Sequence, residues 1–186
     1  VLSTGDFSAG QVRGPMQCTF ARSVDPILSL EAAITRKSVT TAEDAEKQMK
    51  KDGEITGTMG RKNLIPYGLY VSHWFFNPHF AKQTQFSWDD LKITCQALLQ
   101  MFELDRSSSR GLMATRKLIA FQHATALGND RAAALFERVR FARKDSAKPA
   151  RAWSDYDVTV QATDPTSGVT TWDLTDPTEF PKLFGG

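Results

Sequence analysis

Residues 69–76 constrain the fold most, because they form the most strand-like stretch of the chain. Their side chains alternate between two faces, with Leu69, Val71, His73 and Phe75 on one and Tyr70, Ser72, Trp74 and Phe76 on the other. Both faces carry large apolar residues. We therefore expect a central strand of a sheet.

Three further segments around it are predicted to be strands or parts of strands. Met16, Cys18 and Phe20 alternate with polar residues, which predicts a strand with one covered face. Residues 33–39 are rich in β-branched side chains, which favours a strand, and a further strand is expected over residues 116–123. Together these segments supply the sheet that the central strand requires.

Two helices are predicted to cover this sheet. Ser87 is a typical N-cap, and the residues after it place an apolar stripe at i, i+4, i+7 and i+11, namely Leu91, Cys95, Leu98 and Phe102. A second helix is expected over residues 130–139. Residues 156–160 and 169–174 flank the turn sequence TDPTSG and predict a C-terminal β-hairpin, and residues 176–186 are interpreted as a tail.

The segment between residues 41 and 68 differs from the rest in its charge and glycine content. Thr41 followed by Asp44 matches a capping box, so a short exposed helix or a mobile segment is expected there. Residues 54–68 contain several glycines and a proline, which indicates a projecting loop or an irregular hairpin.

This order of elements predicts one α+β domain, with helices on one side of an antiparallel sheet. Among such folds we favour the ferredoxin-like layout, which is also that of the RNA-recognition motif and leaves a sheet face open to a ligand. A chain of 186 residues with 41% hydrophobic residues has enough apolar material for its core.

The composition excludes several other classes. Only Cys18 and Cys95 are present, far apart, so we expect neither a disulfide framework nor a cysteine metal site, and we interpret both as buried thiols. No run approaches the ~20 apolar residues of a membrane span, and the start lacks the features of a secretory signal. We expect a cytoplasmic protein without metal or cofactor.

The charge is distributed unevenly along the chain. Residues 110–151 hold ten lysines and arginines against three acids, a local charge of +7, while the rest of the chain sums to −5. A basic block of this kind suits a protein that binds a polyanion and has protein neighbours elsewhere. A solvated helix face with its following loop explains the charge equally well.

Several sequence blocks resemble one known family. In chain order they are GQVRGPMQ, FARS, ITRKSV, TMGRKNLIPYGLY, MFELDRSSSRG and ALGN. They closely resemble the C-terminal part of the backbone subunit of the type I-C CRISPR surveillance complex (Cascade), a member of the repeat-associated RNA-binding superfamily. The family begins with a strand, a glycine-rich turn and a basic helix, so we expect part of the fold to lie upstream of residue 1.

The resemblance implies a non-catalytic protein that stacks in several copies along one CRISPR RNA. Its partners would be that RNA, target DNA through the guide, further copies of itself and other Cascade subunits. A palm with an RNA-recognition-like fold would comprise residues 1–39 and 69–186, and an inserted thumb would comprise residues 40–68.

Two regions supply the candidate RNA-binding residues. At the lip of the first strand we name Gln11, Arg13 and Gly14, since a guanidinium can fork onto phosphate oxygens. Arg13 could equally tie down loop carbonyls as a structural residue. Arg22 follows at the end of that strand.

The second region is the expected thumb and the strand before it. Met59 could wedge beside an RNA base that the thumb displaces from pairing with DNA, and Gly60 would let the backbone approach the RNA closely. Arg61 and Lys62 would bind phosphate. A flexible solvated turn is the alternative for this loop. Strand alternation would turn Arg36 and Lys37 to opposite faces, so at most one of them should face RNA.

Two other function classes remain open from the residues alone. An RNA-processing endoribonuclease of the same superfamily would use a histidine near the scissile phosphate, but His73 and His123 fall in predicted strands and His79 in a loop. A protein-interaction scaffold without nucleic acid also fits the composition. We expect Arg106 and Arg110 to contact a neighbouring copy or to pair with Asp105 or Glu103.

Overall fold

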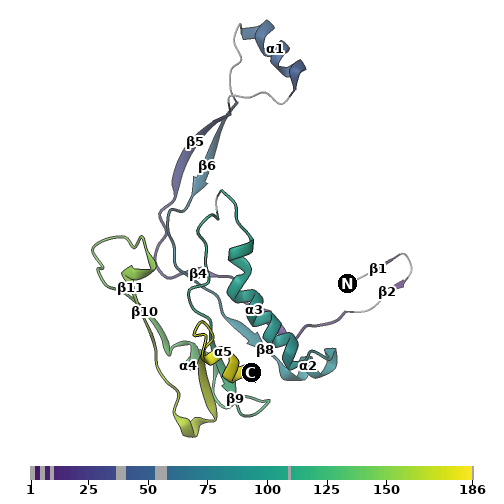
Figure 1. The fold of residues 1–186 in the computed structure, drawn as a ribbon, viewed down its shortest axis with the longest axis vertical. Helices are drawn as coiled ribbons and strands as arrows, with labels where there is room; N and C mark the ends of the chain where they lie inside the picture. The colour runs from purple at the N-terminus through teal and green to yellow at the C-terminus, as the bar shows by residue number, and fades with distance from the viewer. Residues whose placement is uncertain are drawn as a thin grey trace. The chain divides into compact units, whose positions relative to one another are not determined.

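The computed structural model describes residues 3–4, 7–8, 11–36, 41–52, 58–108 and 110–185 (Figure 1). The chain divides into two compact units. The smaller unit spans Asp25–Leu69, and the larger unit contains Val1–Val24 and Tyr70–Gly186. The expected division into palm and thumb segments at residues 39 and 68 stays a prediction.

The described residues of the smaller unit form a two-stranded ribbon and one helix. β5 (Leu30–Arg36) pairs antiparallel with β6 (Thr58–Leu64), and we call these two strands the ribbon. α1 (Ala42–Asp52) follows β5 and lies beyond the end of the ribbon in Figure 1. The capping pair predicted before α1 is present, since the Asp44 N–H donates to Thr41 Oγ1 at 3.2 Å. The prediction of a short helix here is confirmed.

The prediction of a loop at residues 58–62 is wrong, because these residues form most of β6. Glycine does not break the strand at Gly60, since the described glycines with positive φ are Gly128, Gly168 and Gly185. The backbone of residues 58–62 finds its hydrogen-bond partners in β5 instead. As a result, successive side chains of β6 point to opposite faces of the ribbon.

The N-terminal strands of the larger unit pair with the segment that follows residue 69. β3 (Met16–Cys18) pairs with β8 (Trp74–Phe76), and β4 (Arg22–Ser23) pairs with β7 (Tyr70–Val71), both antiparallel. The short strands β1 (Ser3–Thr4) and β2 (Phe7–Ser8) pair with each other.

The central strand expected at residues 69–76 is therefore two short strands. Between β7 and β8, the Ser72 hydroxyl donates to the Thr19 carbonyl at 2.9 Å, and the His73 N–H donates to Thr19 Oγ1 at 3.0 Å. These side-chain bonds replace regular ladder bonds and interrupt the strand. Within the described ranges both pieces pair along one edge only, so the prediction of a central strand is wrong.

Two further antiparallel pairs lie towards the C-terminus. β9 (Ile119–His123) pairs with β12 (Val169–Asp173), and β10 (Val139–Arg143) pairs with β11 (Tyr156–Val160). The strands that flank TDPTSG form as expected, but they pair with other strands and not with each other. The residues between them form a 3-10 turn at Pro165–Ser167, and each strand finds its partner further back in the chain. Another 3-10 turn occurs at Trp153–Asp155.

The described part of the larger unit also contains four helices, α2 (Pro78–Thr84), α3 (Trp88–Leu104), α4 (Ala132–Phe136) and α5 (Glu179–Phe184). Both predicted helices are confirmed, although α4 is shorter than residues 130–139. Ser87 and Asp90 form the capping box of α3, with the Asp90 N–H donating to Ser87 Oγ at 3.1 Å. Hydrogen bonds from the Ser87 backbone and side chain lower the pKa of Asp90.

The core of the larger unit lies between α3, α5 and the β9–β12 pair. Cys95, Leu174 and Phe184 are its buried centre, and partly buried Leu91, Leu118, Ala120, Trp172, Phe180 and Leu183 surround them. The prediction that residues 176–186 form a tail is wrong. Apolar residues at positions 180, 183 and 184 recur at helical spacing, so this segment folds as α5 and docks onto the core.

Helices combined with small antiparallel sheets confirm the α+β class. The arrangement is consistent with an incomplete ferredoxin-like palm. Among the residues that the structure describes, every sheet is two-stranded. None of the described helices is long and apolar enough to cross a membrane.

Candidate nucleic-acid interface

The loop at residues 11–15, which we call the lip, precedes β3 and exposes the polar residues that the sequence predicted. Gln11, Arg13 and Gly14 are exposed, whereas Pro15 is buried and its carbonyl accepts from the Asn77 N–H at 2.8 Å. Arg13 makes no hydrogen bond or ion pair with another described residue. The alternative that Arg13 ties down loop carbonyls therefore has no support within the described part of the chain.

Arg22 occupies a comparable position in β4. It lies opposite Val71 in the ladder, and its side chain is exposed without a partner among the described residues. A guanidinium without a carboxylate or carbonyl partner keeps its five donors for an external group. Arg13 and Arg22 are thus two available cations on the larger unit.

Gly14 and Gly60 are not required by the backbone or by packing. Neither has the left-handed φ that favours glycine. A Cβ atom added at Gly14 would meet nothing within 4 Å, and one at Gly60 would only reach the Ile34 carbonyl at 4.0 Å. Both positions leave open space beside the backbone, which is the room that a closely approaching ligand needs.

The ribbon presents two different faces. Met59 and Arg61 share one face with Glu31, because Arg61 lies opposite Ala33 and Glu31 is two residues from Ala33 along β5. Arg61 Nε lies 3.2 Å from Glu31 Oε1, and the side chains of Arg61 and Glu31 are 83% and 53% exposed. Met59 is 75% exposed. This face offers an apolar side chain beside a cation that is partly neutralised.

Lys62 points to the other face of the ribbon, together with the positions of Gly60 and Arg36. The interpretation of Arg61 and Lys62 as one phosphate-binding pair in a loop is therefore corrected, since a regular strand separates their side chains. Lys37 lies outside the described residues. A single groove that joins Arg13 to Arg61 and Lys62 stays a prediction, because these residues belong to different units.

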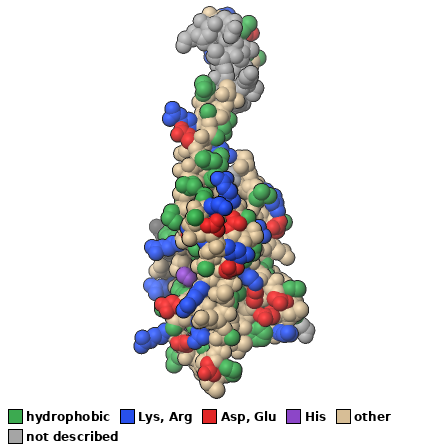
Figure 2. Space-filling view, turned by 90° about the vertical axis from the view of Figure 1, so that its left-hand side faces the viewer, with side chains coloured by type: hydrophobic (Ala, Val, Ile, Leu, Met, Phe, Trp, Pro, Cys, Tyr) green, Lys and Arg blue, Asp and Glu red, His purple; other side chains and the backbone are tan. Residues whose placement is uncertain are grey.

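Much of the basic block at residues 110–151 has a structural use. Arg138 Nη1 donates to the Ala162 carbonyl at 3.0 Å, and Arg143 donates to the carbonyls of Lys148 and Ser146 at 3.0 and 2.9 Å. Lys117 pairs with Asp173. On the face that Figure 2 shows, basic side chains are interspersed with acidic ones. The sequence could not reveal this, because the partners are backbone carbonyls and distant acids.

The loop after α3 behaves as predicted. Arg106 pairs with Glu103, and Arg110 Nη1 lies 2.6 Å from Asp105 Oδ2. Arg106 also donates to the Gly111 carbonyl at 2.7 Å. These contacts hold the polar loop against the end of the helix and confirm the expected ion pairs.

Two histidines are engaged in packing or hydrogen bonding, as expected. His73 stacks on Phe136 with ring centroids 4.1 Å apart. His123 Nδ1 accepts from the Asn129 N–H at 2.9 Å, which leaves its proton on Nε2 when the ring is neutral. His79 was expected in a loop, but it lies in the first turn of α2, where its N–H donates to the Asn77 cap.

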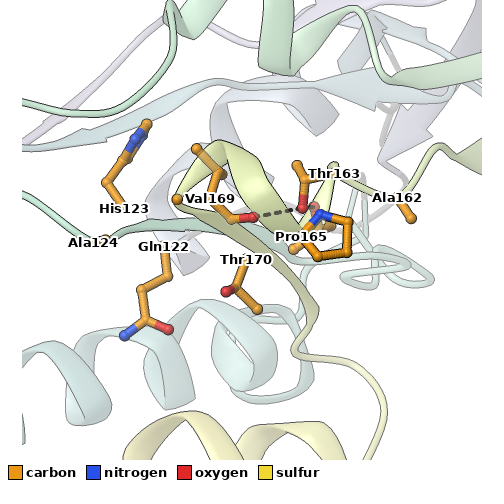
Figure 3. Close-up of a pocket in the computed structure, with 10 residues that line it drawn as sticks. Gln122, His123, Ala124, Ala162, Thr163, Pro165, Val169 and Thr170 are labelled. Carbon is orange, nitrogen blue, oxygen red and sulfur yellow. Dashed lines mark hydrogen bonds between the residues drawn. The ribbon is translucent and has the colours of Figure 1, made fainter.

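His123 lines an open pocket of about 480 Å³ at the end of the β9–β12 pair (Figure 3). Gln122 and His123 are successive residues of β9 and point in different directions in Figure 3. Thr163 lies across the pocket from His123 in Figure 3, and its hydroxyl donates to the Val169 carbonyl at 2.6 Å. Among the described residues no cluster of histidine, cysteine and carboxylate side chains could hold a metal ion.

Sequence reasoning missed the position of Phe20. The alternation of Met16, Cys18 and Phe20 predicted one covered face, but the strand ends at Cys18 and Phe20 is 95% exposed. Cys18 is also exposed, whereas Cys95 is buried and its burial raises the pKa of its thiol. The prediction of two buried thiols is thus confirmed for Cys95 only. The sequence signal that could have indicated an exposed Phe20 was Arg22, the cation two residues later in FARS.

A protein-family model described as CRISPR-associated protein Cas7 matches residues 1–161. The chain belongs to the Cas7 family. The match includes the whole smaller unit and continues past β11 in the larger one. Cas7 membership indicates a role in a CRISPR RNA-binding complex and association with other Cas proteins. A search of curated proteins finds no match.

Proposed function

We propose that this Cas7-family chain is a non-catalytic backbone subunit of a type I-C Cascade complex, in which several copies bind side by side along one CRISPR RNA. The guide RNA recognises target DNA by base pairing, and the subunit recognises the shape and charge of the RNA. Other Cascade subunits complete this cytoplasmic complex, which needs no cofactor. The family match over residues 1–161 carries the proposal.

The exposed lip before β3 supports a role in phosphate binding. Arg13 and Arg22 are exposed without partners among the described residues, and Gly14 leaves space beside the backbone. RNA held without sequence preference needs this combination of cations and accessible backbone. We assign Gln11, Arg13, Gly14 and Arg22 to the palm side of the RNA interface.

The ribbon supports a thumb that reaches over the RNA. Its strands carry α1 at the far end, and both faces present a cation, Arg61 on one and Lys62 on the other. We assign residues 40–68, which include α1 and β6, to the thumb and leave β5 in the palm segment. Met59 and Arg61 would then lie on the face beside a guide base that the thumb keeps from pairing with DNA. The positions of Gly60 and Arg36 accompany Lys62 on the opposite face.

The non-catalytic part of the proposal draws on the histidines. General acid-base cleavage requires a histidine with at least one nitrogen within reach of the scissile phosphate. His73 is stacked against Phe136, and His123 is fixed by Asn129. Both side chains therefore have structural uses that account for their presence.

The proposal is tested by purifying the full-length subunit and sizing the nucleic acid that remains bound. We expect RNA of CRISPR-repeat-and-spacer length, protected along its length by several copies of the subunit. Progressive shortening of added RNA would instead support the endoribonuclease, and a preparation free of nucleic acid that also fails to bind added RNA would support the scaffold. A subunit with Arg13 and Arg22 both changed to Gln should retain less RNA than the unchanged subunit does.

A further inference from the structure

The segment that links β3 to β4 contains a bulge at Phe20. Met16, Gln17 and Cys18 lie opposite Phe76, Phe75 and Trp74, and Thr19 continues this register because its N–H donates to the His73 carbonyl at 2.9 Å. In β4, however, Arg22 lies opposite Val71. From Thr19 to Arg22 the chain therefore uses one residue more than its partner does from His73 to Val71. Phe20 and Ala21 together oppose Ser72, which is the definition of a β-bulge.

The bulge is held firmly on both sides. Thr19 takes part in three hydrogen bonds with the opposite strand, through its N–H, its carbonyl and its hydroxyl oxygen, at 2.9, 2.9 and 3.0 Å. Arg22 is fixed in the ladder with Val71. The backbone on both sides of Phe20 is therefore held by hydrogen bonds and strand pairing, so Phe20 does not lie on a long loop.

The ring of Phe20 is almost completely exposed. Its relative exposure is 95%, whereas Trp74, Phe75 and Phe76 of the facing strand are 38%, 41% and 39% exposed. A β-bulge can re-aim a side chain away from the sheet, and here the aromatic ring that follows Thr19 is exposed. Two residues further on, the guanidinium of Arg22 has no partner among the described residues.

We propose that Phe20 is a stacking platform for one base of a single-stranded RNA, with Arg22 bound to a phosphate of the same strand. An aromatic ring and a cation on one clamped segment match the two parts of a nucleotide, since bases stack on aromatic faces and phosphates bind guanidinium groups. Such a contact tolerates any base, because every base has a π-face. The inference rests on the proposed RNA binding. It adds Phe20, an uncharged residue that the charge pattern does not identify, to the RNA-contacting residues.

The test compares RNA with bases to RNA of the same length in which the bases are removed and the sugar-phosphate backbone is retained. The full chain and its Phe20→Ala variant are titrated with both by fluorescence anisotropy. We expect Phe20→Ala to weaken binding of the base-containing RNA by at least about fivefold, with no change for abasic RNA and no change in the salt dependence. Phe20→Tyr, which keeps the ring, should bind like the unchanged chain.

Leu112→Ala is the matched control, because Leu112 is 94% exposed and belongs to the same unit. It should bind both RNAs as the unchanged chain does. The inference is overturned if Phe20→Ala binds base-containing RNA normally, or if it loses abasic RNA to the same extent. A variant that binds RNA normally but no longer self-associates in sedimentation would assign Phe20 to a contact between copies, which also overturns it.

Failure of this inference is distinguishable from failure of the proposed function. If the unchanged chain binds neither RNA, then the proposed RNA binding itself is wrong. If it binds both equally well and Phe20→Ala has no effect, then RNA binding stands and the stacking role of Phe20 is refuted.

Discussion

Replacing Arg13 and Arg22, two exposed cations of the larger unit, should change the salt dependence of RNA binding. Arg13 and Arg22 are exposed without partners among the described residues, so each can neutralise one phosphate. Each such contact on a single strand contributes about 0.7 to the slope of log affinity against log salt, so Arg13→Gln with Arg22→Gln should reduce the slope by about 1.4. Over a roughly fourfold rise in salt, the unchanged chain would lose about sevenfold more affinity than the variant does.

The structure supplies a control with the same change in net charge. Arg106 and Arg110 are already paired with Glu103 and Asp105, so replacing both with Gln removes two positive charges without removing a predicted phosphate contact. The assay is fluorescence anisotropy with a labelled single-stranded RNA at several salt concentrations. We expect the slope of this control to match that of the unchanged chain.

Two results would refute the reasoning. One is a slope for the Arg13 and Arg22 variant equal to that of the unchanged chain, which would mean that neither guanidinium binds phosphate. The other is an equal reduction in the Arg106 and Arg110 control, which would mean that overall charge matters and position does not.

Three further predictions follow from buried, paired and exposed side chains. Phe184→Ala should destabilise the fold by about 3–5 kcal/mol, because Phe184 is 6% exposed. Phe20→Ala should change stability by less than about 0.5 kcal/mol, because Phe20 is 95% exposed. Equal thermal midpoints for the two variants would contradict the docking of α5. Partial burial raises the pKa of Asp173, but hydrogen bonds from Lys117 and Thr175 outweigh this effect and lower the pKa below its ordinary value of 3.8. The ionised Asp173 should therefore contribute fully to stability above pH 3.8, and this contribution should disappear as the pH falls below that value. Denaturation measured across this pH range should show that the stability of Asp173→Asn falls less steeply with decreasing pH than that of the unchanged chain. An equally steep fall would count against the pairing of Asp173 with Lys117. Glu31→Gln should release Arg61 and tighten RNA binding with little effect on stability, whereas unchanged affinity would argue against a phosphate contact by Arg61.

Local sequence patterns predicted the elements that depend on nearby residues. Ser87 caps α3 as expected, and Thr41 forms the expected cap with Asp44, because each of these bonds spans three residues. The apolar stripe of α3 was also correct, since helical periodicity is a local property. The ion pairs of Arg106 and Arg110 could be predicted for the same reason, because their partners lie within five residues.

Strand pairing was harder to predict, because partners far apart in the sequence decide it. Residues 156–160 and 169–173 were recognised as strands, yet each pairs with a strand further back in the chain. The segment at residues 58–62 has the composition of a loop, but β5 provides hydrogen-bond partners that make it a strand. That change separates Arg61 from Lys62, so the candidate site changed together with the pairing.

The sequence by itself determined the α+β class, the long capped helix and the family blocks, since these follow from periodicity, capping residues and residue order. Only the tertiary structure decided which side chains are exposed at the candidate interface. A one-residue bulge opposite Ser72 turned Phe20 outwards, and distant acids and carbonyls engaged much of the basic block. The physical reason is that exposure and charge neutralisation depend on three-dimensional neighbours, which local patterns do not specify.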